Sequence, residues 1–342
     1  MIWQIDLLIL TMIILCALAA IKLKDMLSAA IVFGAYSFLL CLIWVEMGSV
    51  DVGFTEAAVG AGVSTVLFIA AVYRTTRTIA PPVVGRNFLK LIGFLSSVAL
   101  GIVLLFAVGD FPDWADPNSP ASLHVSPYYI LNTIKETSVP NIVTSVLADY
   151  RGFDTMLETT VIFAAGIAVI AILRRRIPYT DNNISETVEA VQPEIKNNII
   201  IQTICRQMVP FMQLFALYVI AHGHHSPGGG FQGGVILGAS FILLSISYDL
   251  QMMLKRMSEK WNIILANIGV LIFAGIGTLC VFLGANFLDY SILHKILPAT
   301  SQVEARSHGM LGIEIGVGIA VMAIMITIYT NIASDGKHDK GL

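Results

Sequence analysis

The sequence predicts an all-α, polytopic membrane protein with about nine transmembrane helices. Of its 342 residues, 56% are hydrophobic and only 13% are charged, and the mean hydropathy is +0.80. Soluble domains carry about 25% charged residues, so a soluble chain of this composition could not cover its surface with polar groups. Apolar stretches of about 17–24 residues recur along the chain, which is the length that crosses about 30 Å of hydrocarbon.

The apolar stretches fall into groups of three, two and four helices. The first stretch is too long for the apolar part of a signal peptide and lacks a small-residue cleavage pattern, so we expect it to be retained. Polar segments at 74–87 and 174–197, rich in Arg, Pro, Gly or Asn, separate the groups. The predicted helices span residues 3–21, 27–46, 53–73, 88–108, 157–173, 199–221, 231–248, 262–283 and 310–332.

The positions of Lys and Arg predict the orientation of these helices. With the N-terminus outside, the five inside segments carry 2, 4, 4, 3 and 2 basic residues, whereas the outside loops carry four in all and Arg206 lies within a span. Because basic residues concentrate in cytoplasmic loops, this imbalance favours an outside N-terminus and a cytoplasmic C-terminus. We therefore expect a multi-pass protein of the cell membrane, with the lipid bilayer as its surroundings.

The connection between the fourth and fifth helices, residues 109–156, is the longest loop. Its first part carries several Asp and Pro residues and predicts irregular coil. Residues 127–149 place apolar side chains at helical spacing with Pro140 among them, which predicts two short helices lying on the membrane surface or partly re-entrant. The polar C-terminal residues 335–342 are expected to form a disordered tail.

Several functions are disfavoured by what the sequence lacks. The net charge is −3, and no basic block interleaved with aromatic residues indicates a nucleic-acid partner. The sequence has no phosphate-binding loop, no G-x-S-x-G and no CxxC, so no catalytic residues are assigned and membership of an enzyme complex stays open. The cysteines lie in apolar stretches without metal-type spacing and are interpreted as buried thiols: Cys16, Cys41, Cys205 and Cys280.

We single out three ionisable residues inside apolar stretches long enough to cross a membrane, where a charge costs roughly 3 kcal/mol on insertion scales. Glu56 is surrounded by small residues near the outer end of the third stretch, and Glu314 lies between Gly312 and Gly316 in the last. Each acid is interpreted either as a proton or sodium relay or as a structural hydrogen-bonding group between helices. Arg206 is either a relay candidate or a side chain that extends to the inner surface.

A cluster of charge precedes the fifth helix. Asp154 and Glu158 are four residues apart and share a helix face if the helix begins that early. Acids at a helix N-terminus are favoured by the helix dipole, which gives a purely structural explanation. The alternative is an entry for ions at the mouth of the helix, or a packing contact made through Arg151.

Three histidines and a run of glycines lie between the sixth and seventh helices. His222, His224 and His225 have no Cys, Asp or Glu beside them in this loop, so we expect no metal site but count them as candidates for sensing or carrying protons. Glycines at four-residue spacing predict faces where helices pack closely, and these are Gly230, Gly234 and Gly238, with Gly312 and Gly316 in the last helix.

Three blocks of the chain resemble known proteins of membrane complexes. Residues 1–80, with Asp51 and Phe54-Thr55-Glu56-Ala57-Ala58-Val59-Gly60, resemble the D subunit of membrane-bound hydrogenases, which also matches part of the C-terminal extension of the Mrp antiporter A subunit. Residues 88–176, with Tyr150-Arg151-Gly152-Phe153-Asp154-Thr155, resemble the hydrogenase E subunit. Residues 198–332, with His222-Gly223-His224 and Pro227 through Gly234, resemble the Mrp antiporter B subunit, called F in the hydrogenases.

This resemblance implies a division of the chain into modules. A hydrogenase-D-like module of three helices covers 1–80, and a hydrogenase-E-like module of two helices with the external loop covers 81–178. A cytoplasmic linker at 179–197 precedes an Mrp-B-like module of four helices at 198–334 and the tail at 335–342.

The resemblance also implies the function of an ion-translocation subunit in a multisubunit, redox-driven sodium/proton pump of the membrane-bound hydrogenase type. No cofactor is expected in this chain, and Na⁺ and H⁺ are the possible transported ions. The implied partners are antiporter-like and small membrane subunits, with a hydrogenase or other iron–sulfur arm as a further possibility. The family's ion paths map onto Glu56, Asp154, Glu158 and Glu314.

Two alternatives remain open at this point. The chain is expected either to serve a redox-driven pump or to be part of a Mrp-type sodium/proton antiporter. In the Mrp antiporters the D- and E-like pieces are fused behind a large antiporter domain, whereas in this sequence they are fused to the B-like module. A third interpretation is a structural adaptor without an ion path of its own.

Overall fold

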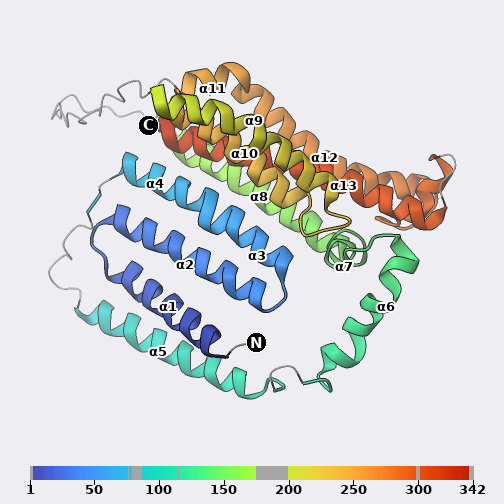
Figure 1. Ribbon diagram of the computed structural model, residues 1–342, viewed down its shortest axis with the longest axis horizontal. Helices are drawn as coiled ribbons and strands as arrows, with labels where there is room; N and C mark the ends of the chain where they lie inside the picture. The colour runs from blue at the N-terminus through green and yellow to red at the C-terminus, as the bar shows by residue number, and fades with distance from the viewer. Residues whose placement is uncertain are drawn as a thin grey trace.

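The computed structural model describes residues 3–75, 77–78, 87–113, 116–174, 199–297 and 301–338, and these form helices without a β-strand (Figure 1). The predicted linker at 179–197 and residues 339–342 of the tail lie outside the described residues. The elements are α1 (Trp3–Lys22), α2 (Met26–Glu46), α3 (Val50–Glu56), the π-helix η1 (Ala57–Ser64), α4 (Thr65–Arg74), α5 (Asn87–Gly109), the π-helix η2 (Ala121–Val125), α6 (Ser126–Thr137), α7 (Ile142–Ser145), the π-helix η3 (Val146–Tyr150), α8 (Gly152–Leu173), α9 (Ile199–His222), α10 (Gly230–Ser247), α11 (Leu250–Arg256), α12 (Glu259–Phe282), the 3₁₀ helix η4 (Tyr290–Lys295) and α13 (Gln302–Ser334).

The all-α membrane fold is confirmed. Within the described parts of the chain, nine helical stretches are long and apolar enough to cross a membrane, and each contains one of the predicted spans or overlaps it. The third is a continuous run of α3, η1 and α4 over Val50–Arg74. The two short helices predicted in the long loop are present as α6 and the α7–η3 pair. Their position relative to a bilayer, and the orientation of the chain, stay predictions.

Two helices begin earlier than the hydropathy pattern predicts. α8 starts at Gly152 rather than at 157, because Asp154 in its first turn suits the positive end of the helix dipole. α13 starts at Gln302 rather than at 310, because Ser301 and Glu304 form a reciprocal capping box that satisfies its first backbone N–H groups. At 33 residues α13 is about 50 Å long, which exceeds a hydrocarbon core of about 30 Å.

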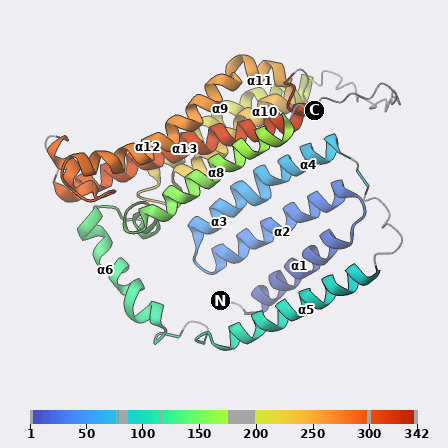
Figure 2. The same ribbon diagram turned by 180° about the vertical axis from the view of Figure 1, so that it is seen from behind.

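The helices form a row and a bundle that lie side by side. Figures 1 and 2 show α5, α1, α2 and then α3–α4 in one row, with the bundle of α8 to α13 next to α3–α4. α13 lies at the centre of the packing, because 72% of its most apolar stretch is buried. At the other edge, no described side chain of α5 is buried, so this helix presents its whole apolar surface outward.

Glycines allow α10 and α12 to approach α13 closely. A Cβ atom at Gly234 would lie 2.6 Å from the carbonyl oxygen of Gly318, and one at Gly230 would collide with the backbone of Glu314. On another side of α13, a Cβ at Gly269 of α12 would lie 2.5 Å from the carbonyl oxygen of Gly316. Any side chain at these positions would push the helices apart, so the helix contacts depend on hydrogen as the only substituent.

Ion pairs and hydrogen bonds connect distant parts of the chain at both ends of the bundle. Near the start of α13, Arg306 donates from Nε to Asp149 at 2.8 Å and lies over the ring of Tyr150, while Tyr290 donates to the carbonyl oxygen of Ala148. Near the other end of α13, Arg74 of α4 donates to the carbonyl of Ala333. Arg174, at the end of α8, pairs with Glu259 of α12 and donates to Asn331 of α13.

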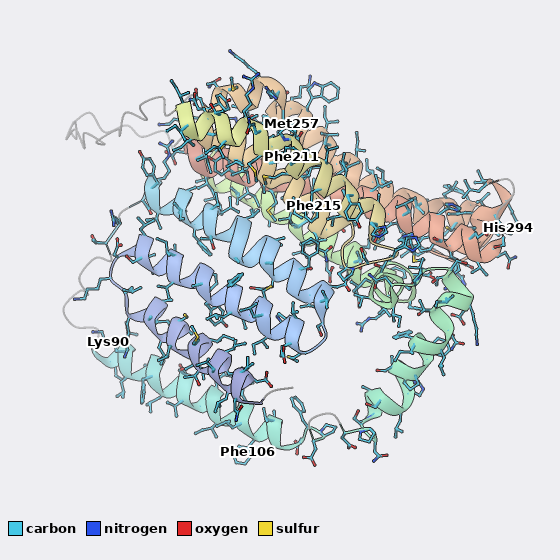
Figure 3. The ribbon with its side chains drawn as sticks, in the orientation of Figure 1. Lys90, Phe106, Phe211, Phe215, Met257 and His294 are labelled. Carbon is cyan, nitrogen blue, oxygen red and sulfur yellow. The ribbon has the colours of Figure 1, made fainter. Side chains whose placement is uncertain are left out.

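Side chains cover the outer faces of the row and the bundle alike (Figure 3). Lys90 and Phe106 of α5 both lie at the rim of the row, and Phe211 and Phe215 lie on the surface of the bundle at α9. Phe106 is 77% exposed and Phe211 is 69% exposed, values that suit contact with lipid or with a neighbouring protein rather than with water.

We predict that Gly234→Ala destabilises the protein and that Gly275→Ala does not. The added methyl group at Gly234 has backbone atoms of α13 within 3 Å, and such overpacking costs about 1–3 kcal/mol. Gly275 of α12 has open space at its Cβ position, and alanine favours a helix over glycine by about 0.5–1 kcal/mol. The thermal unfolding midpoints of the two purified variants measure this difference. Equal midpoints would contradict the proposed close contact.

Candidate functional site

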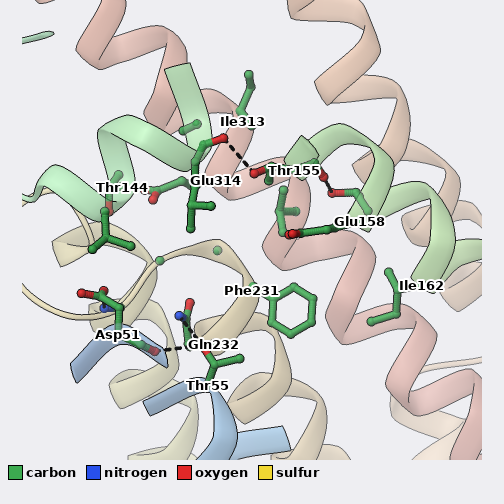
Figure 4. Close-up of a pocket in the computed structure, with 18 of the residues that line it drawn as sticks. Asp51, Thr55, Thr144, Thr155, Glu158, Ile162, Phe231, Gln232, Ile313 and Glu314 are labelled. Atoms are coloured by element: carbon green, nitrogen blue, oxygen red, sulfur yellow. Dashed lines mark hydrogen bonds between the residues drawn. The ribbon is translucent and has the colours of Figure 1, made fainter. Parts of the chain in front are cut away.

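A cavity of about 610 Å³ lies where all three groups of helices meet. Its walls come from α3, from α7 and η3, from α8, from the start of α10 and the loop before it, and from α13 (Figure 4). Apolar side chains such as Leu147, Ile162 and Phe231 form much of the surface. The polar side chains in the wall are Asp51, Thr55, Thr144, Thr155, Glu158, Thr159, Gln232 and Glu314.

Glu314 is the most deeply placed acid of the cavity. It lies in the first half of α13 and is 8% exposed, and its Oε2 atom makes no hydrogen bond within the described part of the protein. Gly223 and Gly229 make room for the carboxylate, because Cβ atoms there would lie 3.3 and 3.1 Å from Oε1. A buried carboxylate oxygen left without a donor is costly, so the groups that face Oε2 decide how this acid is accommodated.

His224 faces this carboxylate from the loop between α9 and α10. Its Nε2 atom lies 3.5 Å from Glu314 Oε2 and is buried without a hydrogen bond among the described residues, while Nδ1 lies 3.3 Å from Ser307 Oγ. Burial lowers the pKa of His224 to about 4, and the nearby His225 and His308 act in the same direction. At neutral pH the imidazole is therefore uncharged, and the 3.5 Å between the two atoms is longer than a hydrogen bond of about 3 Å.

The loop that carries His224 is held by the start of α7. Asn141 donates from its side-chain nitrogen to the carbonyl oxygens of Gly223 and Ser226, each at 3.1 Å, and its backbone N–H donates to the carbonyl of His224. Thr144 donates to the carbonyl of Gly223 at 2.8 Å. These bonds position the imidazole, because they satisfy the backbone of the irregular turn around it.

The first group of helices reaches the same loop through α3. Asp51 Oδ1 accepts from the backbone N–H of Gly228 at 3.1 Å and from the side chain of Asn141 at 3.4 Å. One turn further, Gln232 of α10 donates to Thr55 Oγ1 at 2.7 Å, and Thr55 donates to the carbonyl of Asp51. The carboxylate of Asp51 thus connects parts of the chain that are more than 170 residues apart.

The predicted residues near the fifth helix separate into two places. Glu158 lines the cavity from α8, beside Thr155 and Thr159. Asp154, one turn earlier, accepts from Arg151 Nε at 2.6 Å, and the side chains of that pair are 45% and 61% exposed. An exposed pair of this kind contributes at most about 1 kcal/mol, so Arg151 and Asp154 form a local contact at the helix start rather than a wall of the cavity.

Other predicted residues lie away from the cavity. The side chain of Glu56 lies against Gly60, within the row of helices, and does not line the cavity. His222 stacks on Tyr218 with ring centroids 5.0 Å apart, and His225 is exposed beside it. Arg206 lines a different and smaller cavity.

The predicted glycines lie on the faces of α10 and α13. Gly230 and Gly234 of α10 face α13, as described above, and a Cβ at Gly238 would lie 3.2 Å from Met322 of the same helix. Gly312 and Gly316 of α13 face α12, where Cβ atoms would lie 2.9 Å from Ile276 and Ile272 respectively. The two sets of glycines therefore serve different contacts of one central helix.

Sequence reasoning missed the residues that position the histidine loop, chiefly Asn141, Thr144, Thr55 and Gln232. The signal available for Asn141 was its place after Pro140 and before an apolar run, which is typical of a helix N-cap. Nothing in the local pattern indicates that its side chain also serves a loop more than 80 residues away.

No group of three or more His, Cys, Asp or Glu side chains in the described ranges is arranged to hold a metal ion. The cavity's acids come from separate elements, and Glu314 and His224 are a pair rather than a ligand set.

Comparison with known families identifies three domains in the chain. The MbhD family, described as the D subunit of MBH, matches residues 11–77, and the MbhE family, described as the E subunit of MBH, matches residues 112–190. The MnhB family, described as a "Domain related to MnhB subunit of Na+/H+ antiporter", matches residues 200–327. The chain therefore combines an MbhD, an MbhE and an MnhB-related domain in this order, which confirms the resemblance drawn from the sequence.

Relatives of known description support the same combination. The chain is 23% identical over 340 residues to the probable K(+)/H(+) antiporter A/B subunit of Rhizobium meliloti (strain 1021), covering 92% of this chain and 33% of that protein. It is 26% identical over 138 residues to the putative antiporter protein mnhB2 of Staphylococcus aureus (strain Newman), covering 40% of this chain and 96% of that protein.

A solved structure shares the fold. The structure of the Mrp complex from Dietzia sp. DQ12-45-1b contains a chain that superposes with a TM-score of 0.76 at 24% identity, covering 97% of this chain and 35% of that one. The chain thus spans about one third of the length of the matched Dietzia chain and about one third of the Rhizobium relative.

We predict that Asn141→Ala loosens the histidine loop. The substitution removes one donor from the carbonyls of Gly223 and Ser226, although the Gly223 carbonyl keeps its bond from Thr144. Each lost hydrogen bond costs about 0.5–1.5 kcal/mol. Hydrogen exchange across residues 222–229 should speed up. Asn132→Ala is the matched control, because Asn132 is partly buried like Asn141 but bonds only within its own helix among the described contacts. Unchanged exchange in the Asn141 variant would disprove the positioning role.

We predict that His224 makes the protein sensitive to acid. The imidazole of His224 has a pKa near 6.5 in the unfolded chain, whereas burial lowers this pKa to about 4 in the folded protein. Stability from this group is therefore present above pH 6.5 and is lost as the pH falls towards 4, by up to about 3 kcal/mol. His224→Gln should flatten the fall in unfolding midpoint over this interval. His124→Gln, at an exposed histidine, should keep the wild-type fall in unfolding midpoint. If His224→Gln shows the same pH dependence as the wild type, His224 is not the source of the acid sensitivity.

Proposed function

We propose, from the presence of MbhD, MbhE and MnhB-related domains in one chain, that this protein is an ion-translocation subunit of a multisubunit membrane complex. Within it, Glu314 and His224 would transfer protons in a process coupled to the movement of Na⁺ or K⁺. Descriptions of the relatives as parts of sodium/proton or potassium/proton antiporters support this choice of ions.

The observation that carries the proposal is a pair of buried atoms that face each other at 3.5 Å beside a cavity, Glu314 Oε2 and His224 Nε2. Neither atom has a hydrogen bond among the residues that the structure describes. A histidine and a carboxyl group can share one proton in two arrangements, so the pair can take up a proton from one side and release it to another. Transfer of a proton between the two atoms requires them to approach to about 3 Å or a water molecule to bridge them.

The cavity supplies a route to this pair. Its volume of about 610 Å³ is ample for several water molecules, each of which occupies about 30 Å³ in the liquid. Asp51 and Glu158 add two carboxylates to its wall. In the proposal Glu158 connects the pair to α8, with Asp154 and Arg151 at the mouth of that helix, while His222 and His225 lie on the outer side of the loop.

Glu56 has a separate place in the proposal. Its carboxylate lies in the row of helices next to a π-helical stretch of eight residues, η1, and such stretches often occur at functional sites. We propose that it serves an ion path shared with a neighbouring protein of the complex rather than the cavity.

Membrane subunits of the same complex are the proposed partners, antiporter-like and small ones. The fully exposed α5 and the nearly unburied α1 offer apolar surface for them or for lipid. The proposal retains the division into modules at 1–80, 81–178 and 198–334, the outside N-terminus, and a location in the cell membrane.

Two kinds of complex fit these observations. The matches to the MbhD and MbhE families favour a redox-driven pump with an iron–sulfur arm, whereas the fold shared with a chain of an Mrp complex and the antiporter relatives favour a secondary antiporter. Mass spectrometry of the native complex in mild detergent separates them: iron–sulfur proteins alongside antiporter-like ones indicate the pump, and antiporter proteins alone indicate the exchanger.

We predict that Glu314→Gln abolishes most proton-coupled transport while the complex still assembles. Glutamine has the shape of glutamate but cannot release a proton at neutral pH, and loss of a proton-transferring group costs at least about tenfold in rate. Proteoliposomes with the whole complex and a pH-sensitive dye measure the rate, and the exposed Glu46→Gln variant is the control.

His224→Gln should cause a similar loss, and the double variant should be little worse than either single one, because both residues act in one step. Full transport in an assembled Glu314→Gln complex would leave the structural adaptor as the better interpretation.

A further inference from the structure

A second cavity, of about 330 Å³, lies at the opposite end of α9 from the histidine loop. Its lining comes from α9, α10 and α11 and includes Arg206 and Arg256. Figures 1 and 2 show α11 at the end of the bundle where α9 begins, next to the C-terminal end of the chain. Nothing in the proposed proton path uses this place.

The two arginines bring positive charge to the cavity without a matching carboxylate. No Asp or Glu is among the described residues that line it, and neither guanidinium forms an ion pair or hydrogen bond within the described ranges. Of the carboxylates near this end of the bundle, Glu259 is engaged elsewhere, since it pairs with Arg174 and His338. The cavity therefore offers two unpaired guanidinium groups to an anion.

Arg206 is placed where an unpaired charge is costly. It is the eighth residue of α9, about 10 Å along the helix from Ile199, and apolar residues surround it in the sequence. A cation at this depth is retained in membrane helices when it reaches the interface or meets an anion. Pro210, which also lines the cavity, has no N–H and so leaves the carbonyl of Arg206 without its helical partner.

The rest of the lining divides into a polar and an apolar part. Gln213 and Tyr248 supply an amide and a hydroxyl group, and Tyr248 donates to the carbonyl of Gln202 at 3.2 Å. Val209, Leu244 and Met252 supply apolar surface beside them. This combination suits a molecule that has an anionic head and a hydrocarbon part.

We propose that this cavity binds a phosphate group through Arg206 and Arg256. Two guanidinium groups match the oxygens of a phosphate, because each can donate two parallel hydrogen bonds. The two sources of that group are the head group of an anionic phospholipid and free phosphate. Basic cavities between transmembrane helices at the membrane surface are suited to anionic lipids, and the apolar part of the lining would then contact the start of an acyl chain.

The test uses the whole complex, delipidated in detergent, and measures the rise in unfolding midpoint on adding phosphatidylglycerol, phosphatidylcholine or inorganic phosphate. We expect phosphatidylglycerol to stabilise the wild-type complex and phosphatidylcholine to do so much less. In the Arg206→Gln, Arg256→Gln double variant the phosphatidylglycerol effect should require at least about tenfold more lipid, because two charge-assisted contacts are lost. Lys255→Gln, Lys260→Gln is the matched control, with the same loss of charge outside the cavity.

The arms of this experiment separate the two sources. Stabilisation by phosphatidylglycerol alone identifies a lipid site, and equal stabilisation by inorganic phosphate, lost in the double variant, identifies a site for the free anion. If the double variant and the lysine control respond alike, Arg206 only extends to the membrane surface and the proposal is wrong.

A second measurement avoids the risk that the double variant fails to fold. A photoactivatable phosphatidylglycerol is added to the wild-type complex, and the labelled peptides are mapped. We expect labelling within 206–213 and 248–256 that excess unlabelled phosphatidylglycerol or phosphate removes. Labelling of these segments that neither competitor reduces, or no labelling there, would overturn the proposal.

Discussion

The contact of α13 with its neighbours is the constraint on which the rest of the structure depends. α13 is buried over most of its length, and the backbones of α10 and α12 touch it at Gly234 and Gly269. In lipid there is little hydrophobic driving force between helices, so dispersion contacts and buried polar groups must hold them. Asn262 of α12 provides one such polar group, donating to the carbonyl of Ala323 and to Thr327. Close approach on two sides places α13 between α10 and α12.

This close packing also explains how an acid can be kept in the middle of the protein. The backbone of α10 begins directly against that of Glu314, so the carboxylate points into the histidine loop and the cavity instead of towards lipid. Gly223 and Gly229 leave the volume it needs. Glycines that fix the helices and glycines that make room for the carboxylate therefore act at the same place, so the helix packing and the surroundings of the carboxylate cannot be changed independently.

The regions of the chain are joined by polar contacts at three levels along the bundle. Arg306 with Asp149 lies at one end, Asp51 with Gly228 and Asn141 lies beside the cavity, and Arg174 with Glu259 lies at the other end. Each contact connects two of the three family domains. In contrast, α5 has no buried side chain among those described, which leaves it for lipid or a partner. The cavity at Arg206 and Arg256 adds a place where the membrane itself could contribute a ligand.

The sequence by itself determined the class of the protein and the positions of its helices, because the length and polarity of each apolar stretch are local properties that a membrane requires. It also singled out Glu314, His224 and the glycines, since charge and small residues in apolar surroundings are visible in one dimension. It did not distinguish Glu56 from Glu314, because both are acids among small residues. Only the tertiary structure placed Glu314 opposite His224 and brought Asp51 and Asn141 to the same loop. These contacts join residues from about 80 to about 180 positions apart, and which faces of the helices meet depends on the packing of the whole bundle.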